Sequence, residues 1–197
     1  MTGRIVPRLG AMSGLLYFVV LVAGSFLGGD NGRRVELVGM LFFLPFLGYL
    51  WSVLRRAEGA EGWLSTTALG AGLAGLIVKI ASAAPLLAAD KEAEGTRLHD
   101  ALVNVNDVSF IVTMLPLGVF AAAVATVTLK TGALPRWLGW LAAVTAPALI
   151  ANGLFLGSTN GPAFLLFLLW LVATSVVLTL RAGAAPVGAT GPLPVAA

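Results

Sequence analysis

The sequence contains no cysteine and a single histidine, His99. Without cysteine, the chain can form no disulfide, offers no thiolate nucleophile and holds no cysteine-ligated iron–sulfur cluster. One histidine cannot complete the histidine and cysteine ligand sets that bind zinc. We therefore expect no metal site and no cofactor.

Charge is also scarce, because charged residues make up 11% of the 197 residues while 58% are hydrophobic. The mean hydropathy is +0.95, which leaves too little polar surface for a soluble domain. The net charge of +3 comes from basic residues dispersed around apolar runs, so we expect no nucleic-acid partner. The sequence predicts an all-α, polytopic membrane bundle that forms one domain over residues 1–181.

Continuous apolar blocks indicate six transmembrane helices, since each approaches the ~20 residues that cross a ~30 Å hydrocarbon core. The predicted spans cover roughly 10–28, 37–54, 64–88, 106–129, 137–157 and 163–181. Residues 182–197 are rich in proline, glycine and alanine and predict a disordered tail. Arginine outnumbers lysine, and alanine and glycine are abundant, which indicates a GC-rich bacterial genome. We expect a multi-pass protein of the bacterial inner (plasma) membrane.

The basic residues predict the orientation, because short cytoplasmic loops are enriched in arginine and lysine. With both termini cytoplasmic, the inner side holds Arg4, Arg8, Arg55, Arg56, Lys130, Arg136 and Arg181. The outer side then holds fewer: Arg33, Arg34, Lys91 and Arg97. The same orientation places four tryptophans at the inner interface: Trp51, Trp63, Trp137 and Trp140. The first span also fits a cleaved signal peptide, but its long apolar run favours a retained signal anchor.

Small residues in the third span predict close helix packing. The stretch "GAGLAG" at 70–75 matches a dinucleotide-binding pattern, but no strand precedes it, so we interpret it as a packing surface. Small side chains let helix backbones approach closely in lipid. We expect Gly72 and Gly75 to face Gly118 and Ala122 of the fourth span. Four spans also contain a proline, and each predicts a kink: Pro45, Pro85, Pro116 and Pro147.

Lys79 lies in the middle of the third span, where a lysine costs about 2.5–3.5 kcal/mol to insert. Gly72, Gly75 and Ser82 share its helical face, so Lys79 should point into the bundle. The fourth span supplies a polar stripe at helical spacing: Asp100, Asn104 and Asp107. We expect Asp107 to be the leading partner of Lys79, with Glu36 and Asn152 completing a polar cluster that binds a ligand or joins helices. Structural pairing and snorkelling of the lysine remain alternatives.

The loop "GALPRWLG" at 132–139 predicts an inner-leaflet anchor formed by Arg136, Trp137 and Trp140. Together with the polar start of the fourth span and the opening "RLGAMSGLLYFVVLVAGSF", this loop resembles a family of small bacterial six-helix membrane proteins, domain of unknown function number 4386. The resemblance covers most of residues 8–181. It implies a topology and no established activity.

The sequence leaves several classes of function open. The first is a membrane protein that binds a small molecule or lipid, or assists a partner, through an outward-facing polar pocket near Lys79. Its partners would then be the lipid bilayer and the ligand. The alternatives are an intramembrane acid–base enzyme such as an isoprenoid cyclase, for which Asp107 and Glu36 are the candidates, and a small proton-linked carrier. Whether the protein is an enzyme is undecided by the sequence, as is its oligomeric state.

Overall fold

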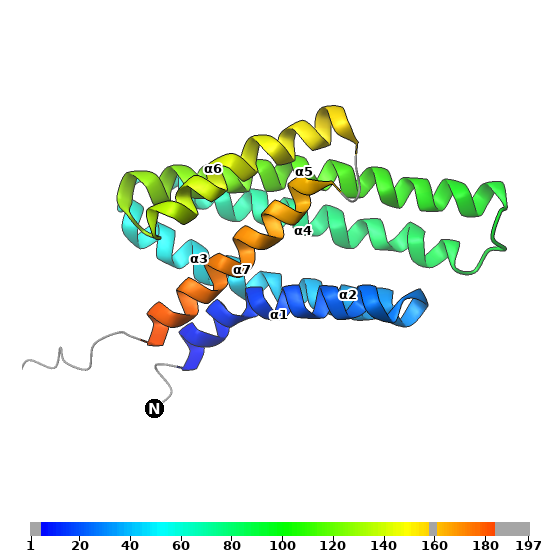
Figure 1. Ribbon diagram of the computed structural model, residues 1–197, viewed down its shortest axis with the longest axis horizontal. Coiled ribbons are helices and arrows are strands. Elements are labelled where there is room, and N and C mark those ends of the chain that lie inside the picture. Colours follow the sequence, from blue (N-terminus) through cyan, green and yellow to red (C-terminus); the bar gives the residue numbers. More distant parts are fainter. Residues whose placement is uncertain (1–4, 158–160, 184–197) are drawn as a thin grey trace, which may run out of the picture.

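The computed structural model describes residues 5–157 and 161–183, and these form an all-helical bundle (Figure 1). In chain order the elements are α1 (Ile5–Leu27), α2 (Gly29–Leu41), α3 (Phe43–Glu58), α4 (Trp63–Ala89), α5 (Arg97–Thr131), α6 (Arg136–Ala151), the π-helical turn η2 (Asn152–Leu156) and α7 (Pro162–Gly183). Residues 184–197, which hold most of the predicted tail, and Arg4 lie outside the described residues.

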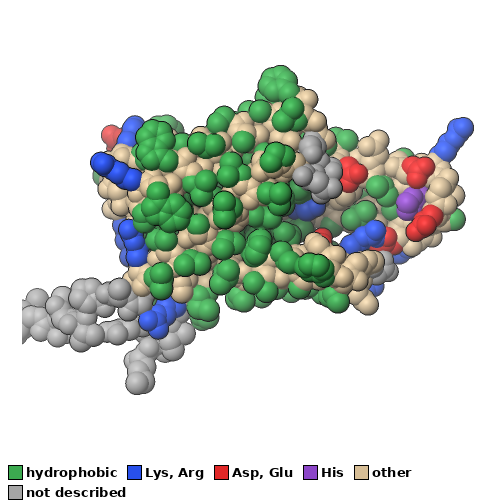
Figure 2. Space-filling view, viewed as in Figure 1, with side chains coloured by type: hydrophobic (Ala, Val, Ile, Leu, Met, Phe, Trp, Pro, Cys, Tyr) green, Lys and Arg blue, Asp and Glu red, His purple; other side chains and the backbone are tan. Residues whose placement is uncertain are grey.

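Within the described residues, six helical segments are long and apolar enough to cross a membrane. They confirm the six predicted spans, and the chain is a multi-pass membrane protein by length and composition. The second span combines α2 with α3, and the fifth combines α6 with η2. An apolar belt covers most of the visible surface, and charged side chains gather at its two ends (Figure 2).

The helices run back and forth between two ends of the bundle (Figure 1). The beginning of α1, the α3–α4 turn, the α5–α6 turn and the end of α7 lie together, and we call this the terminal end. The α4–α5 connection lies at the opposite end. With 35 residues, α5 is about 52 Å long and therefore exceeds the ~30 Å hydrocarbon core. Its first turns, which carry Asp100 and Asn104 of the polar stripe, project beyond the other helices at the opposite end (Figure 1).

The second span is interrupted at Phe42, three residues before Pro45. Proline has no N–H and its ring crowds the preceding turn, so the regular ladder cannot pass through it. The N–H of Phe42 instead donates to the carbonyl of Gly39 at 3.0 Å, closing a tighter turn. The regular helix is therefore interrupted beside Pro45, one of the positions where a kink was predicted. Pro85, Pro116 and Pro147 lie within continuous helices.

Local capping sets the helix ends at the α3–α4 turn and at the α5–α6 turn. The carboxylate of Glu58 accepts hydrogen bonds from the N–H groups of Leu64 and Ser65, at 2.9 and 2.8 Å. These donors belong to the first turn of α4 and have no partner inside the helix, so Glu58 caps it from the preceding helix. Gly132 ends α5 in the left-handed conformation with φ 72°, as expected for a residue just past a helix. Arg136, Trp137 and Trp140 follow this turn and are all exposed at the terminal end.

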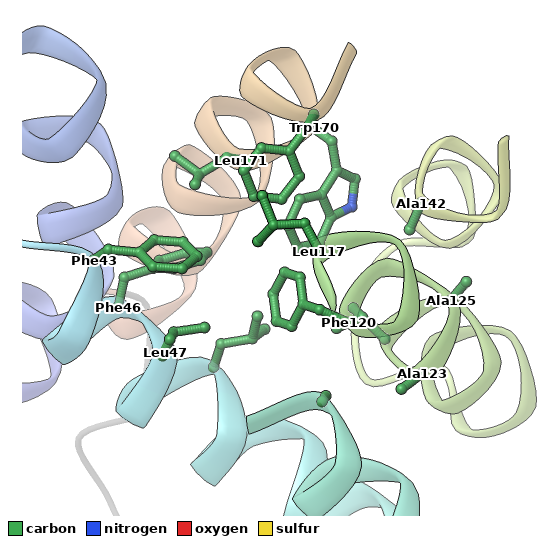
Figure 3. Close-up of a cluster of buried hydrophobic side chains, with 14 of the residues drawn as sticks. Phe43, Phe46, Leu47, Leu117, Phe120, Ala123, Ala125, Ala142, Trp170 and Leu171 are labelled. Carbon is green, nitrogen blue, oxygen red and sulfur yellow. The ribbon is translucent and has the colours of Figure 1, made fainter. Parts of the chain in front are cut away.

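Aromatic side chains from α3, α5 and α7 form the centre of the bundle (Figure 3). The ring of Phe120 packs edge-on against Phe43, Phe167 and Trp170, with centroid distances of 5.6–6.4 Å. Edge-to-face contacts of this kind add to the free energy of apolar burial. This layer closes the interior on the side of the terminal end, because Trp170 and Phe120 are buried almost completely.

The packing surface predicted for the third span is only partly as expected. Gly75 does face α5, since a Cβ there would lie 3.0 Å from the side chain of Leu117. A Cβ on Gly72 would first meet Leu47 of α3 at 2.7 Å and then Phe120. The prediction for Gly118 is wrong, because its close neighbours are Ile150 and the carbonyl of Ala146 in α6. Ala122 is exposed and takes no part in the seam.

Candidate functional site

A cavity of about 450 Å³ lies between the aromatic layer and the opposite end of the bundle. Six helices line it, namely α1, α2, α3, α4, α5 and α7. Its wall is formed by Tyr17, Leu21, Ser25, Glu36, Met40, Phe43, Gly75, Leu76, Lys79, Asn106, Asp107, Phe110, Thr113, Leu117, Phe164 and Phe167. The space-filling view shows basic and acidic side chains in a recess between the apolar belt and one charged end (Figure 2).

Lys79 extends into this cavity from α4, on the same side as Gly75. At 1.5 Å per residue it lies about 24 Å along the helix from Trp63, which places it within a hydrocarbon core ~30 Å thick, in the half nearer the α4–α5 connection. Its amine Nζ lies 4.5 Å from the centroid of the Phe110 ring on α5. The negative face of an aromatic ring attracts an ammonium group, so this contact partly replaces the water that the lysine has lost. Its inward orientation therefore agrees with the prediction from helical spacing.

Two carboxylates reach the cavity from different helices. Glu36 comes from α2 and accepts a hydrogen bond from the hydroxyl of Ser25 on α1 at 3.1 Å. Close backbone contact makes this possible, because a Cβ on Gly24 would lie 2.8 Å from the carbonyl of Gly32. Asp107 comes from α5 and accepts from the amide of Asn106 at 3.1 Å. Both carboxylates line the same cavity as Lys79.

The leading pair predicted between Lys79 and Asp107 is not a direct ion pair. In the described part of the chain, neither Asp107 nor Glu36 comes within 4.0 Å of the lysine amine. The helix α2 brings a second carboxylate to the same cavity, and the amine lies over the ring of Phe110. The pocket therefore holds three charged side chains that remain accessible from the cavity.

The other predicted cluster residues lie elsewhere. Asp100 and Asn104 are exposed on the part of α5 that projects beyond the bundle, and His99 Nδ1 lies 3.3 Å from Asp100. Asn152 is buried at the start of η2, where its amide donates to the sulfur of Met114 at 2.7 Å. It joins α6 to α5 and does not line the cavity.

Several cavity residues were not expected from the sequence. Asn106 adjoins Asp107 in the chain, and its amide group was the signal that could have identified it. Tyr17, Phe110 and Phe164 look like ordinary apolar span residues, so no local pattern distinguishes them. The edge of the Phe110 ring meets Phe164 on α7 with a centroid distance of 5.0 Å. This contact connects α5 to α7 beside Lys79.

An ion pair between Arg33 of α2 and Asp90 at the end of α4 lies near the opposite end of the bundle. Both side chains are partly shielded from solvent. The pair holds the helix that carries Glu36 against the helix that carries Lys79, and so keeps two of the charged cavity groups together.

The chain matches no protein-family model, and searches of curated proteins and of solved structures also give no match.

Proposed function

We propose that the protein binds a small amphipathic molecule or a lipid in the cavity around Lys79. The observation that carries the proposal is the cavity of about 450 Å³, in which aromatic and aliphatic walls surround three charged side chains. Sites for small molecules are mostly apolar spaces of about 300–1,000 Å³ in which a few polar groups converge. The polar groups would orient the ligand, and the apolar walls would hold its hydrocarbon portion.

The position of these charges in the membrane supports a functional role. Ionisable residues inside a bilayer are costly and usually serve binding, transport or proton transfer. A purely structural lysine would be expected to pair closely with one carboxylate or to reach the headgroups. Lys79 instead lies on Phe110, with neither Glu36 nor Asp107 within 4.0 Å of its amine, and all four line one accessible space.

For the membrane orientation we propose cytoplasmic termini in a bacterial inner membrane. The terminal end carries exposed tryptophans at the starts of α4 and α6, with Trp63 61% and Trp140 63% exposed. Exposed tryptophans mark a membrane interface, and basic side chains in short loops are typical of the cytoplasmic one. In this orientation the cavity lies in the outer half of the membrane. The resemblance to family 4386 remains a prediction and adds no activity.

An intramembrane acid–base enzyme or a proton-linked carrier is the alternative function. Its support is that Glu36 and Asp107 reach the same cavity from different helices, so that one could donate a proton while the other accepts one. A carrier would also have to open the aromatic layer around Phe120 toward the terminal end. Uptake of a labelled solute into proteoliposomes would support the carrier, whereas binding without uptake supports the first proposal.

The test of the binding proposal uses three small amphiphiles that differ only in their polar group: 4-phenylbutan-1-ol, 4-phenylbutylamine and 5-phenylpentanoate. Purified protein in a non-ionic detergent is titrated with each, and its midpoint of thermal unfolding is followed by tryptophan fluorescence. A ligand that binds only the folded state raises this midpoint in proportion to its occupancy. We expect at least one probe to raise it saturably.

The matched variants are Leu21→Trp, which adds volume to the cavity wall, and Leu16→Trp on the exposed side of the same helix. Leu21→Trp should abolish the saturable increase, and Leu16→Trp should retain it. If no probe stabilises the wild type, or if both variants respond like the wild type, the cavity is not the binding site and the proposal fails.

A further inference from the structure

We infer that the ligand of this cavity carries a protonated amine, so that the site selects amphiphilic ammonium compounds over neutral and anionic ones. The inference rests on the proposed function and deepens it, because it assigns the chemical class of the ligand. Three independent features of the cavity lead to it: the balance of charge, an unused hydrogen-bond acceptor and the aromatic wall.

The balance of charge in the cavity is negative. Its lining contains two carboxylates, Glu36 and Asp107, and one amine, Lys79. When all three are ionised, one negative charge has no counterpart in the wall. An uncompensated charge in a poorly solvated site is unfavourable, and a ligand of opposite charge removes that cost. A cationic ligand would balance the site, whereas an anionic ligand would double the excess.

The second feature is the amide of Asn106, which is 91% buried because its exposed fraction is 9%. Its NH2 group donates to Asp107, and this orientation is fixed because a carboxylate can only accept. The carbonyl oxygen Oδ1 is left without a hydrogen-bond partner among the described residues. A buried acceptor without a donor costs free energy, so this position calls for an N–H or O–H group from the ligand. Asp107 and Asn106 together would accept two hydrogen bonds from one ammonium.

The third feature is the wall around these acceptors. Rings of Tyr17, Phe43, Phe110, Phe164 and Phe167 line the cavity. Phe110 already holds one ammonium, that of Lys79, at 4.5 Å. Aromatic faces stabilise cations once water is excluded, and the same rings accommodate hydrocarbon. A molecule with an ammonium group and an apolar body therefore matches both parts of the wall.

The test compares the three phenylbutyl probes with a fourth, the N,N,N-trimethyl derivative of 4-phenylbutylamine. All have the same apolar body, and dissociation constants are measured at one detergent concentration. We expect the primary ammonium to bind most tightly, the alcohol and the quaternary ammonium several-fold more weakly, and the carboxylate most weakly. The quaternary probe carries the charge but has no N–H to donate to Asn106, so its deficit measures the acceptor.

Charge variants give the decisive comparison. Asp107→Asn should weaken binding of the primary ammonium about tenfold, because it removes a nearby opposite charge. Asp100→Asn makes the same change in net charge on the exposed part of α5 and should leave binding unchanged. Lys79→Met should tighten ammonium binding, since it removes the one cation of the wall. An anion site would instead lose its ligand in Lys79→Met.

The possible failures separate this inference from the proposed function. If the carboxylate binds most tightly and Lys79→Met abolishes its binding, the site is an anion site and the inference is overturned while the cavity remains a binding site. Equal binding of alcohol and ammonium, unaffected by Asp107→Asn, would also overturn it. If no probe binds, both proposals fail. Should Lys79→Met not fold, the comparison of Asp107→Asn with Asp100→Asn decides alone.

Discussion

The amine of Lys79 lies over the ring of Phe110, with Nζ 4.5 Å from the ring centroid. This contact joins the third predicted span to the fourth without a direct ion pair. It also explains how a lysine is accommodated inside the bundle beside two carboxylates that it does not touch. The stability of this arrangement leads to the first prediction.

Replacing Phe110 by leucine should lower the free energy of unfolding by about 2 kcal/mol, because the desolvated ammonium loses its aromatic partner. Phe110→Tyr keeps the ring and should change stability much less. The free energies are measured by denaturant titration in detergent with tryptophan fluorescence. Equal effects of the two substitutions would mean that the ring itself contributes nothing to holding Lys79.

A double-mutant cycle between Lys79 and each carboxylate should show coupling to both. We expect an interaction energy of about 0.5–3 kcal/mol both for Lys79→Met with Glu36→Gln and for Lys79→Met with Asp107→Asn, because all three side chains line one cavity. Lys79→Met should destabilise the fold, since it leaves the two carboxylates of the cavity without a cation. Coupling to Asp107 alone would restore the simple pair that the sequence predicts.

Gly75→Leu should destabilise the protein by about 1–3 kcal/mol, because the new side chain collides with Leu117 of α5. Gly70→Leu is the matched control, since a Cβ at Gly70 on the same helix meets nothing within 4 Å. Leucine also favours helix over glycine, so the control should be neutral or stabilising. Thermal unfolding of the two variants side by side tests this, and a similar loss in both would place the α4–α5 seam elsewhere.

Glu58→Ala should cost about 0.5–2 kcal/mol, because it leaves two N–H groups at the start of α4 without their acceptor. Glu58→Gln keeps one acceptor oxygen and should lose less. Glu61→Ala removes an exposed carboxylate from the same turn and serves as the control. Unfolding in denaturant measures all three, and a cost in Glu61→Ala as large as in Glu58→Ala would contradict the capping role.

The proposed orientation is testable because the chain has no native thiol. Ala60 in the α3–α4 turn and Ala93 in the α4–α5 connection are both exposed and lie at opposite ends. On intact cells, an impermeant maleimide should label Ala93→Cys and should reach Ala60→Cys only after permeabilisation. The reverse pattern would invert the topology and place the cavity in the inner half of the membrane.

The sequence by itself determined the six spans and the inward face of Lys79. Both follow from local properties, namely the length of apolar runs and the positions that share one side of a helix. Gly75 was also assigned correctly, because it lies on that same side. The missing N–H of proline pointed to Pro45 but not to it alone, because Pro85, Pro116 and Pro147 lie within continuous helices.

The tertiary structure decided which of the predicted polar groups meet around Lys79, namely Glu36 and Asp107. Glu36 reaches the cavity because α1 and α2 approach at Gly24 and Gly32, and no periodicity within α2 specifies its neighbours. Gly118 of the fourth span was expected to face the small residues of the third span, but it packs on α6. In a membrane, nearly every face of a span is apolar, so hydropathy cannot select which neighbour a face meets. The rotation and contacts of each helix are set by the shapes of side chains that come together only in the folded bundle.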